Sequence, residues 1–321
     1  MHAYNIVFAG TPEFSAQHLR ALLDSPHSIK GVYTQPDRAA GRGKQLQASA
    51  VKKLALEAGL PVYQPQSLKG EQDQQVLTSL GADLLIVVAY GLILPQAVLD
   101  IPPLGCLNVH ASLLPRWRGA APIERALLAG DTETGVTIMQ MDKGLDTGAM
   151  LSKVAIPIRD EDDRQTLESR LAEVGTQALI DSLTQLPMLQ ANAQAQDNSL
   201  STYAAKLEKD EALIDWSQSA TIINRTIRGG IGRNPAYCFL NGERVRIVKA
   251  TPLAQTHQSP VGMILEHGHD SLRVACNGSV LEVQMLQFPG KTVQAVAVLL
   301  NSRQEILAPG NCFRSHAEAP T

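Results

Sequence analysis

The chain has 321 residues, of which 44% are apolar and 18% are charged, and its formal net charge at pH 7 is −3. At roughly 150 residues per domain, this length predicts two domains with ordinary buried cores. The near-neutral charge excludes a molecule that attracts nucleic acid over its whole surface, so an anionic partner would need a local basic patch.

Cysteine spacing and apolar runs indicate the compartment. The four cysteines, Cys106, Cys238, Cys276 and Cys312, form no C-x-x-C pair, which argues against a zinc module and against a disulfide framework. No run approaches the ~18 apolar residues of a membrane span, and the N-terminus lacks the basic region of a signal peptide. We therefore expect a soluble cytoplasmic protein that binds no membrane and no metal.

Strand and helix patterns alternate through the first half of the chain. Apolar runs typical of strands occupy residues 5–10, 29–35, 61–65, 83–91, 105–112, 135–142 and 148–158. Helical patterns lie between or after them, at 14–23, 48–58, 71–80, 121–129 and 163–186. Thr11 is expected to cap the first helix, and Glu13 suits the positive end of its dipole. The alternation predicts an α/β domain with a mostly parallel sheet.

The composition changes after the long helix. Residues 188–207 are polar and rich in Gln, Asn and Ser, which predicts a linker. A helix is expected near 218–228, followed by short strands at 236–240, 244–251, 260–266, 271–276 and 279–286. Such regularly spaced short strands favour a small β-barrel. We therefore predict a catalytic domain over 1–187, a linker over 188–207 and a barrel domain over 208–321.

Two polar residues interrupt the apolar strand "CLNVHAS". Asn108 and His110 are two positions apart, so their side chains emerge on one face of the strand. They lie at its carboxyl end, where open α/β sheets place their sites. The turn "MDKGLDTGAM" holds Asp142 and Asp146, either of which could meet His110. An amide, an imidazole and a carboxylate suit acyl-type transfer, although a satisfied structural pair is the alternative. Ser112 lacks the G-x-S-x-G setting of a nucleophile, so direct transfer to an external nucleophile is expected.

Two segments are strongly basic. Residues 34–53 carry five Lys and Arg, among them Arg38, Arg42 and Lys44, against one acid, and Gly41 and Gly43 suggest mobility. Residues 221–250 carry six basic residues against one acid. Each segment is either a solvated surface or a contact for phosphate or nucleic-acid backbone, and together they could hold one polyanion.

The stretches that carry these features resemble a known family. "LNVHASLLPRWRGAAPIERALLAGDTETGVTIMQMDKGLDTGAML" is similar to the signature region of the methionyl-tRNA formyltransferases, and "FAGTPEFSAQHLRALL", "TQPDRAAGRGKQL", "VVAYGLILP" and "GKTVQAVAVLLNSRQEILAPG" resemble the same family. N-x-H followed by S-L-L-P is shared with the wider folate-dependent formyltransferases. The resemblance implies a Rossmann-like formyltransferase domain followed by an OB-like barrel.

The resemblance also implies an activity. The formyl group of 10-formyltetrahydrofolate would pass to the amine of methionine on initiator methionyl-tRNA, with the protein acting as a monomer and without a metal. The implied catalytic residues are Asn108, His110 and Asp146. The implied folate contacts are Ser112, Leu113, Leu114, Pro115, Val88, Ala89, Tyr90, Gly91, Gln140, Met141 and Asp142. We assign the tRNA contacts to Arg38, Arg42, Lys44, Arg225, Arg228 and Arg233.

One segment departs from the family pattern. Where the family carries an Arg-Ala-Phe-Asn-Pro-Trp-Pro-like run, this chain has "RGGIGRNPAYCF" over residues 228–239. Its three glycines predict a flexible loop that either settles on tRNA or merely joins helix to barrel. Other open alternatives are an amino sugar nucleotide or glycinamide ribonucleotide as acceptor, and a nucleic-acid-binding module whose α/β half is a scaffold.

Overall fold

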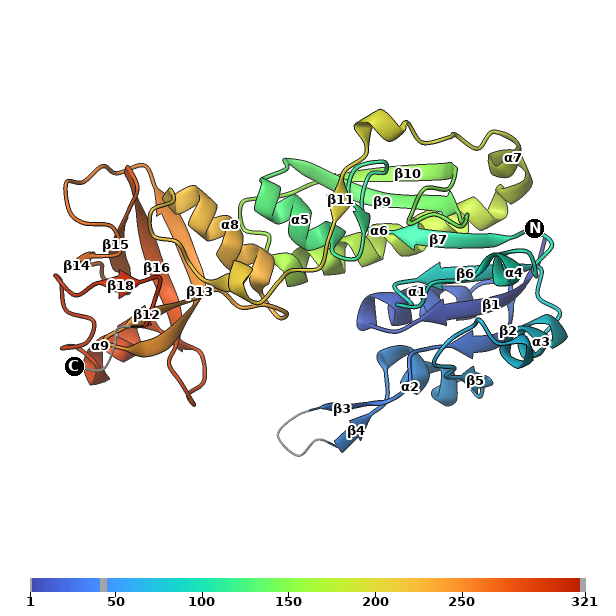
Figure 1. Ribbon diagram of the computed structural model, residues 1–321, viewed down its shortest axis with the longest axis horizontal. Coiled ribbons are helices and arrows are strands. Elements are labelled where there is room, and N and C mark those ends of the chain that lie inside the picture. The colour runs from blue at the N-terminus through green and yellow to red at the C-terminus, as the bar shows by residue number, and fades with distance from the viewer. Residues whose placement is uncertain (1, 41–44, 318–321) are drawn as a thin grey trace. The chain divides into compact units, whose positions relative to one another are not determined.

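The structure, a computed structural model, describes residues 2–40 and 45–317. The chain divides into two compact units (Figure 1). The first comprises Met1–Pro122, Glu133–Pro157 and Glu168–Ala204, and the second comprises Ile123–Thr132, Ile158–Leu167 and Ala205–Thr321.

The first unit is built on a mostly parallel sheet, which confirms the predicted α/β class. Within the described residues its strand order is β10-β9-β7-β6-β1-β2-β5. The strands are β1 (Asn5–Gly10), β2 (Ser28–Tyr33), β5 (Val62–Tyr63), β6 (Leu84–Val88), β7 (Cys106–His110), β9 (Glu133–Gln140) and β10 (Met150–Pro157). Strand β9 is antiparallel to both of its neighbours, whereas the other pairs are parallel. The central strands β6 and β7 are buried throughout, as their apolar runs require.

Helices lie near all five predicted positions, whereas α4 and α7 were not predicted and the cap of the first helix was placed wrongly. The helices are α1 (Glu13–Leu23), α2 (Ala50–Glu57), α3 (Glu71–Ser79), α4 (Gln96–Leu99), α5 (Pro122–Ala129), α6 (Arg164–Thr184) and α7 (Leu186–Ala191). The predicted cap at Thr11 is wrong: Pro12 is the N-cap of α1, and the Thr11 hydroxyl instead donates to the Tyr90 carbonyl at 3.0 Å. Among the described residues, no helix has the length and apolarity needed to cross a bilayer.

The basic segment before α2 contains a hairpin that the sequence did not reveal. Strands β3 (Arg38–Ala40) and β4 (Gln45–Gln47) pair antiparallel, with Arg38 opposite Gln47. Figure 1 shows the hairpin extending away from the sheet. Arg42 and Lys44, two of the predicted tRNA contacts, lie outside the described residues.

Part of the predicted linker pairs with the first unit. Residues 188–204 contain the end of α7, a 3₁₀ turn η1 (Asn198–Leu200) and strand β11 (Tyr203–Ala204). Strand β11 pairs in parallel with β8 (Arg118–Gly119), which lies directly after Trp117 in the loop beyond β7. We call residues 194–204 the strap, because they return along the loop that follows β7.

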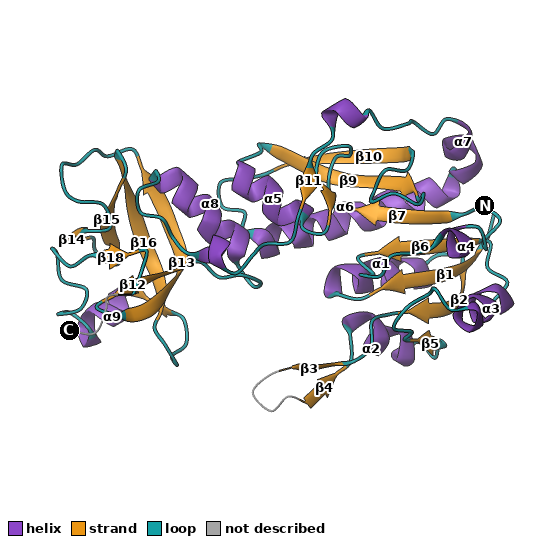
Figure 2. Cartoon of the chain, viewed as in Figure 1, coloured by secondary structure: helices purple, strands orange, loops and turns teal. Residues whose placement is uncertain are grey.

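The second unit is a curled antiparallel sheet with helices packed on it, which confirms the predicted barrel-like fold (Figure 2). Its strand order is β14-β15-β16-β13-β12-β18, with β17 paired to β16. The strands are β12 (Tyr237–Leu240), β13 (Glu243–Leu253), β14 (Ile264–His267), β15 (Leu272–Cys276), β16 (Ser279–Gln287), β17 (Gln294–Ala295) and β18 (Phe313–Arg314). Besides most of α5, the unit contains η2 (Asp210–Ala212), α8 (Ala220–Gly230) and α9 (Val296–Ser302), the last of which the sequence analysis missed. Trp216 stacks on Phe313 in the core, with ring centroids 5.5 Å apart.

The glycine-rich run is partly helical, contrary to expectation. Gly229 and Gly230 form the last residues of α8 and are buried. A Cβ at Gly229 would lie 3.3 Å from the Leu128 side chain, so the glycine allows the backbone of α8 to approach α5 closely. Gly232, with φ of +80°, takes the left-handed conformation just after the helix. These glycines therefore serve packing and chain reversal.

Candidate active site

The structure brings Asn108, His110 and Asp146 together on one face of β7. Both strand residues are buried, and their side chains share a face as the two-residue spacing predicts. Asn108 Nδ2 donates to Asp146 Oδ1 at 3.1 Å, and His110 Nδ1 lies 3.6 Å from Asp146 Oδ2. The side chain of Asp146 is only 13% exposed. An amide, an imidazole and a carboxylate thus meet in a largely dry place.

The second ring nitrogen of His110 orients the imidazole. Its Nε2 lies 2.9 Å from the carbonyl oxygen of Trp117. A carbonyl only accepts, so Nε2 carries a proton and donates it. This leaves Nδ1 as the nitrogen that can take up a further proton, on the side that faces Asp146. The carboxylate is placed to stabilise the resulting imidazolium.

Backbone conformation directs the groups of the site. Within the described residues, four non-glycine residues have positive φ, and three lie in predicted site segments or beside His110: Ala89 (+44°), Trp117 (+64°) and Asp146 (+52°). This region is disfavoured by the Cβ, and such residues concentrate at functional sites. Gly119 N–H donates to Asp146 Oδ2 at 2.8 Å, which adds a second donor to the carboxylate.

The loop that follows His110 is held by the neighbouring strand. Thr137 lies opposite His110 on β9, and its hydroxyl donates to the Ser112 carbonyl at 2.7 Å. The Thr137 hydroxyl oxygen in turn accepts from the Leu114 N–H at 3.1 Å. The Ser112 hydroxyl donates to the Arg116 carbonyl at 2.6 Å. Ser112, a predicted folate contact, is fully buried, so its own contact with folate stays a prediction.

The segment 88–91 continues from the carboxyl end of β6, next to β7. Ala89 and Gly91 are exposed and have positive φ, whereas Val88 and Tyr90 are buried. Burial raises the pKa of the Tyr90 hydroxyl, which has no hydrogen-bond partner among the described residues. The segment thus presents its backbone to solvent while anchoring itself through Tyr90.

The structure separates the residues predicted around the 140–144 turn. Leu107 pairs with Gln140, so Gln140 lies toward the amino end of β7, away from His110. The Gln140 side chain accepts from Gln190 at 2.9 Å. Met141 packs against the core of the first unit. Asp142 is exposed and accepts from the Gly144 N–H and from the Thr147 hydroxyl, which shapes the turn that leads to Asp146.

The predicted tRNA-contact arginines of the second unit have partners inside that unit. Arg225 Nη1 lies 3.4 Å from the Ala129 carbonyl at the end of α5. Arg228 Nη1 donates to three carbonyls, of Arg159, Asp160 and Asp162. Arg233 forms a 2.9 Å ion pair with Glu124, whose side chain is 4% exposed. In the first unit Arg38 is exposed and donates to Gln35 at 3.1 Å. Their contact with tRNA stays a prediction.

The basic segment also supplies a surface that the predicted site omitted. Residues Tyr237, Phe239, Arg244 and Arg246 lie on the outward side of β12 and β13, since the alternating residues between them are buried. The Arg244 guanidinium lies over the Tyr237 ring at 3.6 Å. Tyr237 and Phe239 meet edge to face, with centroids 6.0 Å apart. We call this surface the basic aromatic face.

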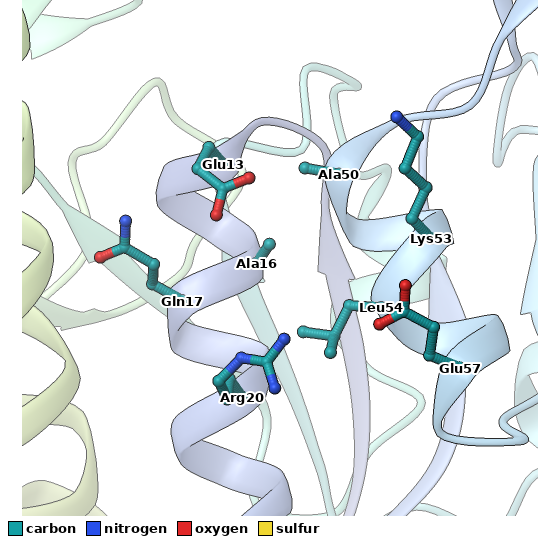
Figure 3. Close-up of a pocket in the computed structure, with 8 residues that line it drawn as sticks. All are labelled: Glu13, Ala16, Gln17, Arg20, Ala50, Lys53, Leu54 and Glu57. Atoms are coloured by element: carbon teal, nitrogen blue, oxygen red, sulfur yellow. The ribbon is translucent and has the colours of Figure 1, made fainter.

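A pocket of about 260 Å³ lies elsewhere, between α1 and α2 (Figure 3). Its rim carries charged side chains of both signs from the two helices, and its lining residues are Glu13, Ala16, Gln17, Arg20, Ala50, Lys53, Leu54 and Glu57. None of these is a predicted site residue. In the part of the chain that the structure describes, no three His, Cys, Asp or Glu side chains are grouped to hold a metal ion.

Protein-family models match both units of the chain. A family model described as "Formyl transferase" matches residues 4–183, and one described as "Formyl transferase, C-terminal domain" matches residues 206–304.

Three of the solved structures that share the fold cover most of this chain. WlaRD, a sugar 3N-formyl transferase crystallised in the presence of dTDP and 5-N-formyl-THF, is 15% identical, with a TM-score of 0.62 over 91% of this chain and 100% of its own. The N-formyltransferase from Helicobacter canadensis, in complex with folinic acid and dTDP-3-aminofucose, is 16% identical, with a TM-score of 0.61 over 87% and 98%. HypX from Aquifex aeolicus, in complex with tetrahydrofolic acid, is 15% identical, with a TM-score of 0.61 over 94% of this chain and 47% of its own. The TM-scores establish a common fold, and the family matches over both units show that the chain belongs to the formyl transferase family and is a formyltransferase.

Proposed function

We propose that this protein transfers the formyl group of 10-formyltetrahydrofolate to the amine of methionine on initiator methionyl-tRNA. The observation that carries the chemistry is the meeting of Asn108, His110 and Asp146 on one face of β7. The resemblance of the motif segments to methionyl-tRNA formyltransferases and the basic surfaces support the choice of acceptor.

Each member of the trio has a role that follows from its geometry. One N–H of the Asn108 amide donates to Asp146, and the other is available to the oxygen of the formyl carbonyl, where negative charge develops. His110 accepts the proton that the attacking amine loses, at Nδ1, and a proton passes to N10 of the folate as the bond between N10 and the formyl carbon breaks. Asp146 stabilises the imidazolium, and the Gly119 N–H keeps the carboxylate in place. When bound, the folate supplies the formyl group itself.

The described residues fit a folate. The family resemblance assigns two loops to folate, after β6 and after β9. An exposed aliphatic side chain lies just beyond each assigned segment, Ile93 at 85% and Leu145 at 60% exposure. Such side chains suit the flat faces of an aromatic ligand. The open backbone at Ala89 and Gly91 can offer amide and carbonyl groups to a heterocycle. Val88–Gly91 and Leu113–Pro115 are therefore the segments that we assign to folate.

The basic aromatic face supports an RNA acceptor. Nucleic acids are held by guanidinium groups on phosphates and by aromatic rings that stack on unpaired bases. Tyr237 and Arg244 already form a cation–π pair, so the face presents both groups in a fixed arrangement. Arg38 on the hairpin adds an exposed cation in the first unit. We assign the acceptor contacts to these groups together with Arg42 and Lys44.

A sugar nucleotide is the second candidate acceptor. Two of the solved structures that share the fold are sugar N-formyltransferases, and one was crystallised with dTDP-3-aminofucose. A basic hairpin could equally receive a diphosphate.

One assay separates the candidates. The protein is incubated with 10-formyltetrahydrofolate and, in parallel, with initiator Met-tRNA, elongator Met-tRNA and dTDP-3-aminofucose. Formylation of the initiator Met-tRNA at a kcat/KM well above that of the sugar supports the proposal. Efficient formylation of the sugar alone refutes the tRNA assignment and leaves the folate chemistry standing.

A further inference from the structure

Two side chains outside the trio, Arg118 and Gln196, connect the Asp146 loop to the strap. Gln196 Nε2 donates to the backbone carbonyls of Asp146 and Gly148, each at 2.8 Å. On its other side, Gln196 Oε1 accepts from Arg118 Nε at 2.9 Å. The two side chains are 78 positions apart in the sequence, so only the fold brings them together.

Chemistry fixes the orientation of the Gln196 amide. A guanidinium only donates and a carbonyl only accepts, so Oε1 must face Arg118 and Nε2 must face the loop. Arg118 is itself 2% exposed, and its Nη2 donates to Asn198 Oδ1 at 2.9 Å. A guanidinium this deeply buried cannot exchange its partners for water without a large loss of hydrogen-bonding energy. The connection from the strap to the loop is therefore rigid.

Asp146 needs such support because of its backbone. Its φ of +52° lies in the left-handed region, which side chains with a Cβ adopt reluctantly. This conformation directs the carboxylate toward Asn108 and His110. Gln196 holds the carbonyl of the same residue, while Gly119, the neighbour of Arg118, holds the carboxylate through its N–H. Asp146 is thus held at both its backbone and its side chain.

We propose that Arg118 and Gln196 are positioning residues for formyl transfer, which hold Asp146 in the conformation that directs its carboxylate at His110. The inference rests on the proposed catalytic role of Asp146. The residues act through Asp146 and do not touch the reacting atoms.

The first test replaces the amide without changing its length. Gln196→Met removes both donors and the acceptor, and Gln194→Met is the matched control, because Gln194 is exposed on the same strap and pairs with Met150 through its backbone. Rates are measured with 10-formyltetrahydrofolate and the acceptor that the wild-type protein formylates, Met-tRNA or dTDP-3-aminofucose. Gln196→Met is expected to lower kcat about 10- to 100-fold, as a ~1 Å misplacement of a catalytic group does. The KM for both substrates stays unchanged, and the control keeps the wild-type kcat.

The second test distinguishes positioning from general damage to the fold. If Gln196 acts only through the Asp146 carboxylate, Gln196→Met causes no further loss of kcat in an Asp146→Asn background. A general structural role would lower kcat equally in both backgrounds, and that additive result overturns the inference, as does a wild-type kcat for Gln196→Met. Gln196→Glu keeps the acceptor for Arg118 and loses the paired donors, so it carries the same test if Gln196→Met does not fold. A wild-type kcat for Asp146→Asn alone would instead overturn the proposed catalytic role, and the positioning role with it.

Discussion

The buried histidine of α1 makes the stability of the first unit depend on pH. His18 is fully buried; its Nδ1 lies 2.7 Å from the Phe14 carbonyl, and its Nε2 has no partner among the described residues and lies against Gly175. Burial lowers the pKa of His18 from 6.5 to about 4, because the imidazolium would lose its hydration. The unfolded chain therefore binds a proton more readily than the folded chain between these two values.

The sign and size of the effect follow from this difference. The free energy of unfolding has its full value, as far as His18 is concerned, above pH 6.5. It falls as the pH drops toward 4, because the unfolded state binds the proton first. The loss relative to neutral pH is about 2 kcal/mol at pH 5 and approaches about 3 kcal/mol near pH 4. His18→Gln removes the titrating group while keeping a donor for the Phe14 carbonyl, so its stability falls less steeply. Carboxylates contribute equally to both proteins and cancel in the comparison.

Urea unfolding at pH 7.5 and pH 5 measures this difference. In a Trp216→Phe background, Trp117 is the single tryptophan and reports on the first unit. Between pH 7.5 and pH 5, the free energy of unfolding of the protein that keeps His18 should fall by about 2 kcal/mol more than that of the His18→Gln variant. Equal pH slopes for wild type and His18→Gln would refute the reasoning.

Three further predictions concern the site and the second unit. Asn108→Ala removes the oxyanion donor and should lower kcat about 10²–10³-fold. His110→Ala and Asp146→Asn remove the proton-transfer groups and should each lower kcat about 10²–10⁴-fold. Single-turnover formylation measures these rates, and all three variants stay folded. Gly229→Val should destabilise the second unit by about 1–3 kcal/mol in urea unfolding followed by Trp216 fluorescence, because its branches meet Leu128, whereas the smaller Gly229→Ala should cost less. Arg233→Met leaves the buried Glu124 carboxylate without this partner and should cost about 1–3 kcal/mol; a stability equal to the wild type's would show that water replaces the pair.

Hydrophobic periodicity predicted the order and type of most helices and strands. It failed where the outcome depends on the direction of a strand or on contacts between residues far apart in the sequence. The apolar run at β9 has the same appearance whether the strand is parallel or antiparallel, so its reversal could not be read from the sequence. The β3–β4 hairpin is short, and its glycines predicted a mobile loop. At α8, local propensity ended the helix before Gly229, but contact with Leu128 outweighs the cost of glycine in a helix.

The trio could be predicted, whereas its supports could not. The spacing of Asn108 and His110 requires a shared face in any strand, and the glycine-bracketed turn supplied Asp146 as a partner. Arg118 is a charged residue next to a tryptophan in a basic loop, which predicts exposure, yet the fold buries it. Gln196 lies in a polar stretch with the composition of a linker. The roles of Arg118 and Gln196 depend on hydrogen bonds between residues far apart in the sequence, and such bonds produce no recognisable sequence motif.

The trio alone cannot select the acceptor. Asn108, His110 and Asp146 act on a carbonyl oxygen and an amine proton, which every primary amine acceptor provides. Selection therefore has to come from charged and aromatic groups elsewhere, and salt reveals which kind of acceptor they hold. A tRNA that contacts several phosphates loses affinity steeply with salt, by roughly 0.9 in log K per phosphate for each decade of salt, whereas a diphosphate can involve only two. Replacing Arg42 and Lys44 by Ala should raise the KM for Met-tRNA and flatten its salt dependence, while the same charge change at the exposed Arg20 and Lys69 should do neither. If the KM for folate rises instead and the KM for Met-tRNA stays unchanged, the basic segment 34–53 belongs to the folate site.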